Sequence, residues 1–162
     1  MWVEKVVVNA SPLICLFRAG LEGILGTLWT SVAVPDAVWN EVLAGPKRDR
    51  AASLLGAAPW ARKVRVPAAA PLVANWDLGP GESAVLTFAL ENPGHFAIVD
   101  DAEARRCAKA LGVPRLGTGG VLILAKHRGV ISSVADALAS LRASGLWLSD
   151  AIVAALKAQA GE

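Results

Sequence analysis

The sequence has few of the side chains that bind soft metals or form cross-links, with only two cysteines and two histidines in 162 residues. Cys15 and Cys107 are far apart and belong to no Cys-x-x-Cys pair, which argues against a disulfide framework and against a zinc site. We expect both thiols to be small apolar side chains inside helices. His95 and His127 lack metal-ligand spacing and an obvious partner, so neither is a good catalytic candidate.

Long apolar runs are also missing. The most apolar stretch, Val121 to Ala125, is followed at once by Lys126, and no run reaches the ~18–20 uncharged residues that span a bilayer. The N-terminus has no convincing secretory cleavage pattern, so we expect a cytoplasmic protein. The composition is 54% hydrophobic and 19% charged, which favours a compact fold over a disordered chain. The net charge of +2 is too small to indicate a nucleic-acid partner.

No linker, charge block or repeat divides the chain, and its length fits one domain, residues 1–162. Strands alternate with helices along the predicted structure, which favours a mainly parallel sheet covered by helices on both faces. A helix is expected to begin at Ser11 as N-cap, with Pro12 in its first turn, and 67–71 is expected to be a loop. Strands are predicted at 5–8, 31–34, 63–66, 95–99 and 113–116, and helices at about 12–20, 21–28, 36–42, up to 55, 83–90, 102–111, 118–129, 133–143 and 149–158.

Polar residues follow two of the predicted strands directly. Asn9 follows the first strand, and Asp100 and Asp101 follow the strand at 95–99. Ligands of parallel α/β sheets bind outside the carboxyl ends of the strands, so these side chains are candidates for one site. Each could instead cap the helix that follows it, and for Asp101 the N-cap interpretation is attractive.

Two glutamates are further candidates. Glu41 lies within the predicted helix 36–42, where it could face the site or be an ordinary exposed side chain. Glu82 follows Leu78-Gly79-Pro80-Gly81 in the first turn of a helix, where a negative charge also stabilises the helix dipole. Metal binding and capping are equally open for Glu82 on the sequence alone.

Five segments in the same order share the pattern of one family: Val6 to Ile14, Val34 to Val42, Leu78 to Ala84, Ile98 to Arg106, and Leu116 to Leu122 with Ala125-Lys126. Together they resemble PIN-domain proteins, in the branch related to VapC toxins that is catalogued as DUF3368. Each segment is a weak signal alone. The resemblance extends from Val6 to about Ala155 and is therefore fairly specific.

The resemblance implies a three-layer α/β/α sandwich that cuts RNA with Mg²⁺ or Mn²⁺, usually as a homodimer and as the toxin that a partner antitoxin blocks. The spacing in the family slightly favours Asp101 over Asp100 for the last acidic position. By the same resemblance, the catalytic residues are Asn9, Glu41, Glu82, Asp100 and Asp101, the metal ligands are Asn9, Glu82, Asp100 and Asp101, and Ser11, Arg105 and Thr118 bind substrate.

Clustered carboxylates suit this chemistry because hard oxygens hold Mg²⁺ or Mn²⁺, which activates water and offsets the repulsion between an acidic site and RNA. Asn9 departs from the family's usual aspartate, since an amide oxygen can bind a metal but adds no negative charge. A weakly active or purely nucleic-acid-binding descendant is therefore an alternative function. An unrelated α/β protein whose acids only cap helices is a third interpretation.

Other residues give weaker signals. Gly117-Thr118-Gly119-Gly120 lacks the Walker ending and does not match a dinucleotide fingerprint, so we do not expect nucleotide binding. Seven cations could attract phosphate or be ordinary solvated charges: Lys47, Arg48, Arg50, Arg105, Arg106, Lys126 and Arg128. Six tryptophans could stack bases but more often anchor a core or an interface: Trp2, Trp29, Trp39, Trp60, Trp76 and Trp147.

Overall fold

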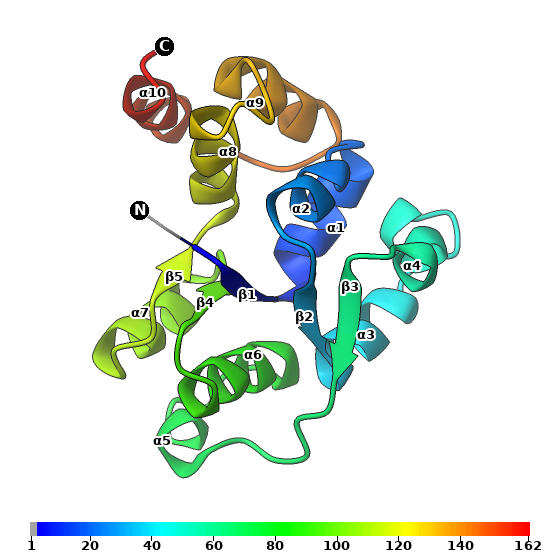
Figure 1. Ribbon diagram of the computed structural model, residues 1–162, viewed down its shortest axis with the longest axis vertical. Coiled ribbons are helices and arrows are strands. Elements are labelled where there is room, and N and C mark those ends of the chain that lie inside the picture. The colour runs from blue at the N-terminus through cyan, green and yellow to red at the C-terminus, as the bar shows by residue number, and fades with distance from the viewer. Residues whose placement is uncertain (1–2) are drawn as a thin grey trace.

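The first strand, β1 (Lys5–Val8), is the centre of the fold, because its three valines are almost completely buried. The computed structural model describes residues 3–162. Within them, five parallel strands form one sheet in the order β3-β2-β1-β4-β5 (Figure 1). The other strands are β2 (Val32–Pro35), β3 (Ala61–Val64), β4 (His95–Ile98) and β5 (Arg115–Leu116).

Helices cover both faces of this sheet, which confirms the predicted α/β/α sandwich (Figure 1). On one face lie α1 (Ala10–Arg18), α2 (Gly23–Leu28), α8 (Thr118–His127), α9 (Val134–Ala143) and α10 (Asp150–Gln159). On the other lie α5 (Pro71–Ala74), α6 (Pro80–Glu91) and α7 (Ala102–Ala110). The helices α3 (Asp36–Leu43) and α4 (Arg50–Leu54), with the 3-10 turn Leu55–Ala57, flank the end of the sheet formed by β2 and β3.

The sequence-based boundaries need three corrections. The helix α1 begins at Ala10, so Asn9 rather than Ser11 occupies the N-cap position. The reason is that β1 passes straight into the helix: the Asn9 amide still donates to Ile98 O on β4, at 3.1 Å. β3 lies two residues earlier than predicted because its register with β2 pairs Val32 with Ala61. The stretch after residue 70 forms the short helix α5, which was not predicted.

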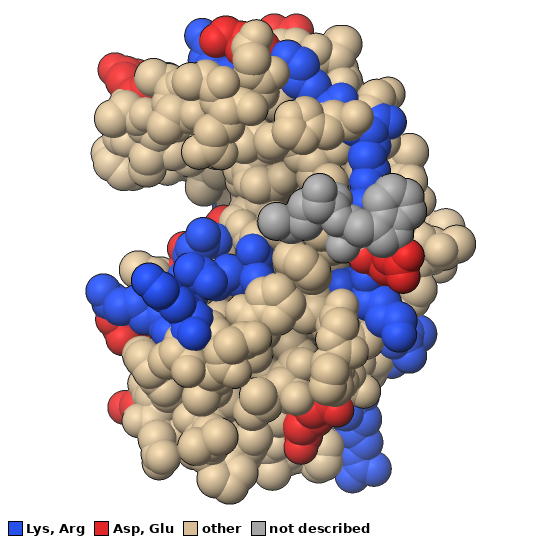
Figure 2. All heavy atoms as spheres, turned by 60° about the vertical axis from the view of Figure 1, so that its left-hand side comes forward, with Lys and Arg blue, Asp and Glu red and all other residues tan. Residues whose placement is uncertain are grey.

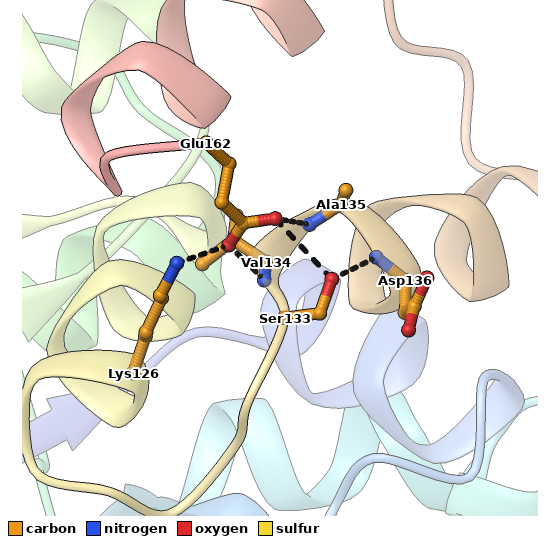
Figure 3. Close-up of polar contacts among 6 residues, drawn as sticks. All are labelled: Lys126, Ser133, Val134, Ala135, Asp136 and Glu162. Atoms are coloured by element: carbon orange, nitrogen blue, oxygen red, sulfur yellow. Dashed lines mark hydrogen bonds and ion pairs between the residues drawn. The ribbon is translucent and has the colours of Figure 1, made fainter.

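A carboxylate clamp ties the end of the chain to α8 and α9 (Figure 3). One oxygen of Glu162 accepts from Lys126 Nζ and from the Val134 amide, both at 2.7 Å, and the other accepts from Ser133 Oγ and the Ala135 amide. The ammonium group and the amides of the first turn of α9 stabilise the anion, so the pKa of Glu162 falls to about 2. This clamp holds α10, none of whose residues is buried, against its two neighbours.

The tryptophans divide between core and surface. Trp29 is buried and donates its indole N–H to Val3 O at 2.9 Å, and Trp60 stacks on Phe17, so both anchor the core as one interpretation predicted. Trp147 is the opposite case, since 80% of it is exposed. Trp2 lies outside the described residues.

Both cysteines are free, Cys107 fully buried and Cys15 partly so, in agreement with the expectation of small apolar side chains. In the described part of the chain, no helix has the length and apolar character needed to span a membrane.

Candidate functional site

Asn9 and Glu41 converge on the backbone of Gly81, in the first turn of α6. A Cβ atom added to Gly81 would lie 3.0 Å from Asn9 Oδ1 and 3.0 Å from Glu41 Oε2. The two oxygens therefore lie within about 6 Å of each other, although Asn9 follows β1 and Glu41 lies on α3, with α1, α2 and β2 between them in the chain. Gly81 is needed here because any side chain would occupy the space between them.

The Asn9 side chain is polar, buried and incompletely bonded. Asn9 is 3% exposed, and its Oδ1 has no hydrogen-bond partner among the described residues. A buried amide oxygen without a partner costs free energy, so such an atom usually points to a missing partner such as water or an ion. The position of Asn9 at the end of β1 thus leaves one hard oxygen available for a ligand.

Glu82 lies next to this pair and interacts with it. Burial raises the pKa of the Glu41 carboxyl, and the negative charge of Glu82 raises it further. Glu82 itself bends back over the N-terminus of α6, with Oε2 2.6 Å from the position of a Cβ on Gly79. Two carboxylates and one amide oxygen therefore lie close together at the N-terminus of α6.

Asp100 belongs to a second cluster, at the start of α8. Its two oxygens accept from the Thr118 amide at 2.7 Å and from the Thr118 hydroxyl at 2.6 Å. Asp100 also lies close to α1, since its charge is the second cause, after burial, that raises the pKa of the Cys15 thiol. The two clusters are linked through the backbone, because the Asn9 amide donates to Ile98 O and Ile98 lies two residues before Asp100.

Asp101 turns away to cap α7. Its Oδ2 accepts from the Ala104 amide at 2.9 Å, as the capping interpretation predicted. Arg105 reaches back to the other side, where Nη1 donates to Val99 O at 3.2 Å and lies 3.0 Å from the Cβ position of Gly117. Asp100 Oδ1 lies 3.1 Å from that same position. Asp100 and Arg105 are therefore neighbours, while Asp101 has a structural role.

The other residues predicted to bind substrate or phosphate mostly have partners within the protein. Ser11 is exposed on α1 and contributes a hydrogen bond to Cys15, and the Thr118 hydroxyl is engaged by Asp100 rather than free for substrate. Lys126 is held by Glu162, and Arg128 donates to Val3 O, so these two cations have structural partners. Gly81 and Gly117 were noted in the sequence only as parts of glycine-containing turns, because only a fold reveals which glycine lies next to converging side chains.

The oxygen donors around Gly81 fit a hard cation, but only two of them belong to carboxylates. Within residues 3–162, no group of three or more His, Cys, Asp or Glu side chains is arranged to hold a metal ion. The amide oxygen of Asn9 would have to complete the set, beside Glu41 and Glu82. Oxygen donors of this kind suit Mg²⁺ or Mn²⁺ rather than zinc.

One face of the molecule has a deep indentation (Figure 2). Figure 2 shows it between the part of the molecule that carries α8–α10, above, and the part that carries α7, below. Lysine and arginine side chains gather on the lower border, whereas the upper border is mostly uncharged (Figure 2). The helix α7 itself carries Arg105, Arg106 and Lys109. We call this indentation the α7–α10 cleft.

A comparison with protein families agrees with this architecture. The DUF3368 family, described as a PIN domain, matches residues 5–162. No curated protein and no solved structure matches the chain significantly.

Proposed function

This chain belongs to the DUF3368 family of PIN domains, and we propose that it is a divalent-metal-dependent endoribonuclease. PIN domains are generally nucleases, so the family supports hydrolysis of phosphodiester bonds. The RNA substrate, the metal and the roles of individual residues are the parts that we add.

One observation carries the proposal: the buried, unbonded Oδ1 of Asn9 and the Oε2 of Glu41 meet at Gly81, beside Glu82. A helix-capping role does not explain this arrangement, because neither Asn9 nor Glu82 makes a side-chain capping bond. Oxygens brought together in this way repel one another unless a cation joins them, which is the arrangement expected of a metal site before the metal binds.

Asn9, Glu41 and Glu82 would hold Mg²⁺ or Mn²⁺, and Asp100 of the neighbouring cluster would complete the acidic site. When bound, the ion would lower the pKa of a water molecule and neutralise charge on the phosphate. Thr118 fixes the orientation of Asp100 through two hydrogen bonds, and Arg105, next to Asp100, offers its guanidinium to a phosphate oxygen. Asp101 stays the cap of α7, so we assign the last acidic position to Asp100.

The family resemblance also suggests a cellular role. We propose that the protein is the toxin of a toxin–antitoxin pair, acts as a homodimer in the cytoplasm, and is blocked by an antitoxin bound over the site. A test is expression in cells. The active chain should arrest growth when expressed alone, and the Asp100→Asn variant should not. Co-expression with the partner antitoxin should relieve the arrest.

Asn9 supports a second candidate, a nucleic-acid-binding module with weak cleavage. The amide leaves the Gly81 cluster with one negative charge fewer than an aspartate would provide, which lowers the affinity for a divalent ion. In this case the α7–α10 cleft would bind RNA without efficient hydrolysis.

The deciding experiment incubates purified protein with end-labelled single-stranded RNA and Mn²⁺, Mg²⁺ or EDTA. We expect cleavage with Mn²⁺ and none with EDTA. Asp100→Asn should lower the rate by at least about 100-fold, because misplacing one group in such a site has effects of this size. Asp101→Asn is the matched control and should stay near the wild-type rate, since asparagine caps helices as well as aspartate. Intact RNA that still shifts in a gel supports the binding module, and neither cleavage nor binding overturns both candidates.

A further inference from the structure

The first turn of α8 carries Thr118, which orients Asp100, yet its sequence forms a helix poorly. The segment is Gly117-Thr118-Gly119-Gly120, and glycine loses more backbone freedom on folding than any other residue. The first amides of a helix also lack a carbonyl partner within it. Backbone bonding of α8 starts with the Val121 amide, which donates to Gly117 O at 3.1 Å. Contacts from other elements are therefore needed to fix this turn.

The side chain of Leu156, on α10, packs directly against the turn. Its two terminal carbons lie 2.7 and 2.8 Å from the position that a Cβ atom would occupy on Gly119. The leucine could not lie so close to a residue with a side chain. Leu156 is partly buried against the core, although α10 has no fully buried residue. The helix α10 thus places an apolar side chain on the residue that follows Thr118.

The carboxylate clamp of Glu162 holds α10 at the other end of α8 (Figure 3). Leu156 contacts the first turn of α8, whereas Glu162 accepts from Lys126 in its last turn. The same carboxylate accepts from two amides at the start of α9. The C-terminal part of the chain is therefore attached to both ends of α8, through an apolar contact at the start and an ion pair at the end.

We propose that α10 is a positioning element of the candidate site: Leu156, held by the clamp, fixes the first turn of α8 and so keeps Thr118 bonded to Asp100. The inference rests on the proposed function, because it takes Asp100 as a group that the reaction needs. Thr118 donates to Asp100 through both its amide and its hydroxyl, so a shift of this turn disturbs two hydrogen bonds at once. Leu156 and Glu162 act through Thr118 and are positioning residues rather than catalytic ones.

Hydrogen exchange of the Thr118 amide, followed by NMR on the metal-free protein, tests this arrangement without an activity assay. The amide has no partner within α8 and is protected by its bond to Asp100. We expect Leu156→Ala to speed its exchange about tenfold, as for local opening after the loss of a partly buried leucine side chain. Leu156→Met should keep most of the protection. Ile152→Ala is the matched control, because Ile152 lies on the same helix and is 47% exposed.

Cleavage kinetics give the second readout. Leu156→Ala should lower kcat about threefold and leave KM unchanged, because it loosens the orientation of Asp100 and leaves the groups that bind substrate in place. Glu162→Gln keeps the shape of the clamp and weakens its bond to Lys126. This variant should change the exchange of Thr118 and kcat in the same direction, by a smaller factor.

Three results would overturn the inference. The first is exchange of the Thr118 amide at the wild-type rate in Leu156→Ala. The second is an equal acceleration at the amide of Val7, in the buried centre of the sheet, which would reveal a general loss of stability. The third is faster exchange at Thr118 with an unchanged kcat, which would separate α10 from the reaction. Failure of the proposed function is distinct: if the wild-type protein cleaves no RNA, the nuclease is refuted, and the exchange at Thr118 still decides whether α10 holds this turn.

Discussion

The two clusters of the candidate site differ in how completely their polar atoms are bonded. Around Gly81, Asn9 Oδ1 has no partner and burial raises the pKa of Glu41. Around Gly117, both oxygens of Asp100 accept hydrogen bonds from Thr118. The first cluster needs a ligand to satisfy it, whereas the second is already fixed by the protein. A site divided in this way can hold its scaffold rigid while its ligand-binding half still gains free energy on binding.

The largest effect is expected from Gly81→Val. The new side chain would fill the space between Asn9 and Glu41, so Mn²⁺ binding should be lost and cleavage should fall by at least about 100-fold. Isothermal titration with Mn²⁺ and an RNA cleavage assay measure the two effects. Gly23→Val is the control, because Gly23 also lies in the first turn of a helix and a Cβ there would meet nothing within 4 Å. Normal activity of Gly81→Val would refute the ligand role of the Gly81 cluster.

In the bonded cluster, Thr118→Val keeps the shape of the side chain and removes one of the two bonds to Asp100. The amide bond remains, so we expect a moderate fall in kcat of about tenfold, as for one hydrogen bond to a charged group, with little change in KM. Thr118→Ser should restore the rate, since it returns the hydroxyl. A fall in Thr118→Ser as large as that in Thr118→Val would mean that packing, not the hydroxyl, matters here.

Asn9→Asp adds charge to the unsatisfied cluster. A third carboxylate beside Glu41 and Glu82 repels both, so the metal-free protein should unfold at a lower temperature. The same charge attracts a divalent ion, and Mn²⁺ affinity should rise about tenfold, with equal or faster cleavage. Thermal unfolding with and without Mn²⁺ measures both effects. Weaker Mn²⁺ binding by the variant would contradict the proposed site.

The smallest effect is expected on the stability of the metal-free protein, in the variant Glu41→Gln. Because the pKa of Glu41 is raised, the fold favours the protonated carboxyl, and stability falls as the pH rises from the ordinary value of 4.5 through the raised pKa. Glutamine resembles the protonated form. The metal-free variant should therefore melt about 1–2 °C higher than wild type at neutral pH, a small gain because Glu41 is only partly withdrawn from solvent, which screens its charge. The difference should vanish below about pH 4. A variant that melts lower at neutral pH would show that this charge is already compensated.

Local signals in the sequence were sufficient for most of the fold. The valines of β1 and the alternation of strands with helices predicted the parallel sheet, and Asp101 was correctly considered as the cap of α7. Errors arose where tertiary pairing decides. β3 is shifted because β2 sets its register, and Asn9 replaces Ser11 at the start of α1 because β4 holds its amide.

The members of the candidate site could be proposed from the sequence, but their arrangement in two clusters could not. Asn9, Glu41, Glu82 and Asp100 could be named from strand ends and family resemblance. They form a bonded cluster at Gly117 and an unbonded cluster at Gly81. Only the fold shows which side chains approach each of these glycines. Lys126 is an opposite case. Its place in the sequence suits phosphate binding, but its ammonium group donates to Glu162, 36 residues later.

The order of the strands also has a consequence for synthesis of the chain. The strand β1 lies between β2 and β4, so its second neighbour emerges only with His95–Ile98. Until then, one edge of β1 lacks its partner, and Asn9 has nothing to bond at Ile98. Every pairing in the sheet spans a crossover, so contacts are distant in sequence and folding is slow compared with that of hairpin-rich or helical proteins of similar size. On the ribosome, the two clusters cannot meet before residue 100 has left the exit tunnel, so the candidate site assembles only after the strands β1 to β4 have all been made.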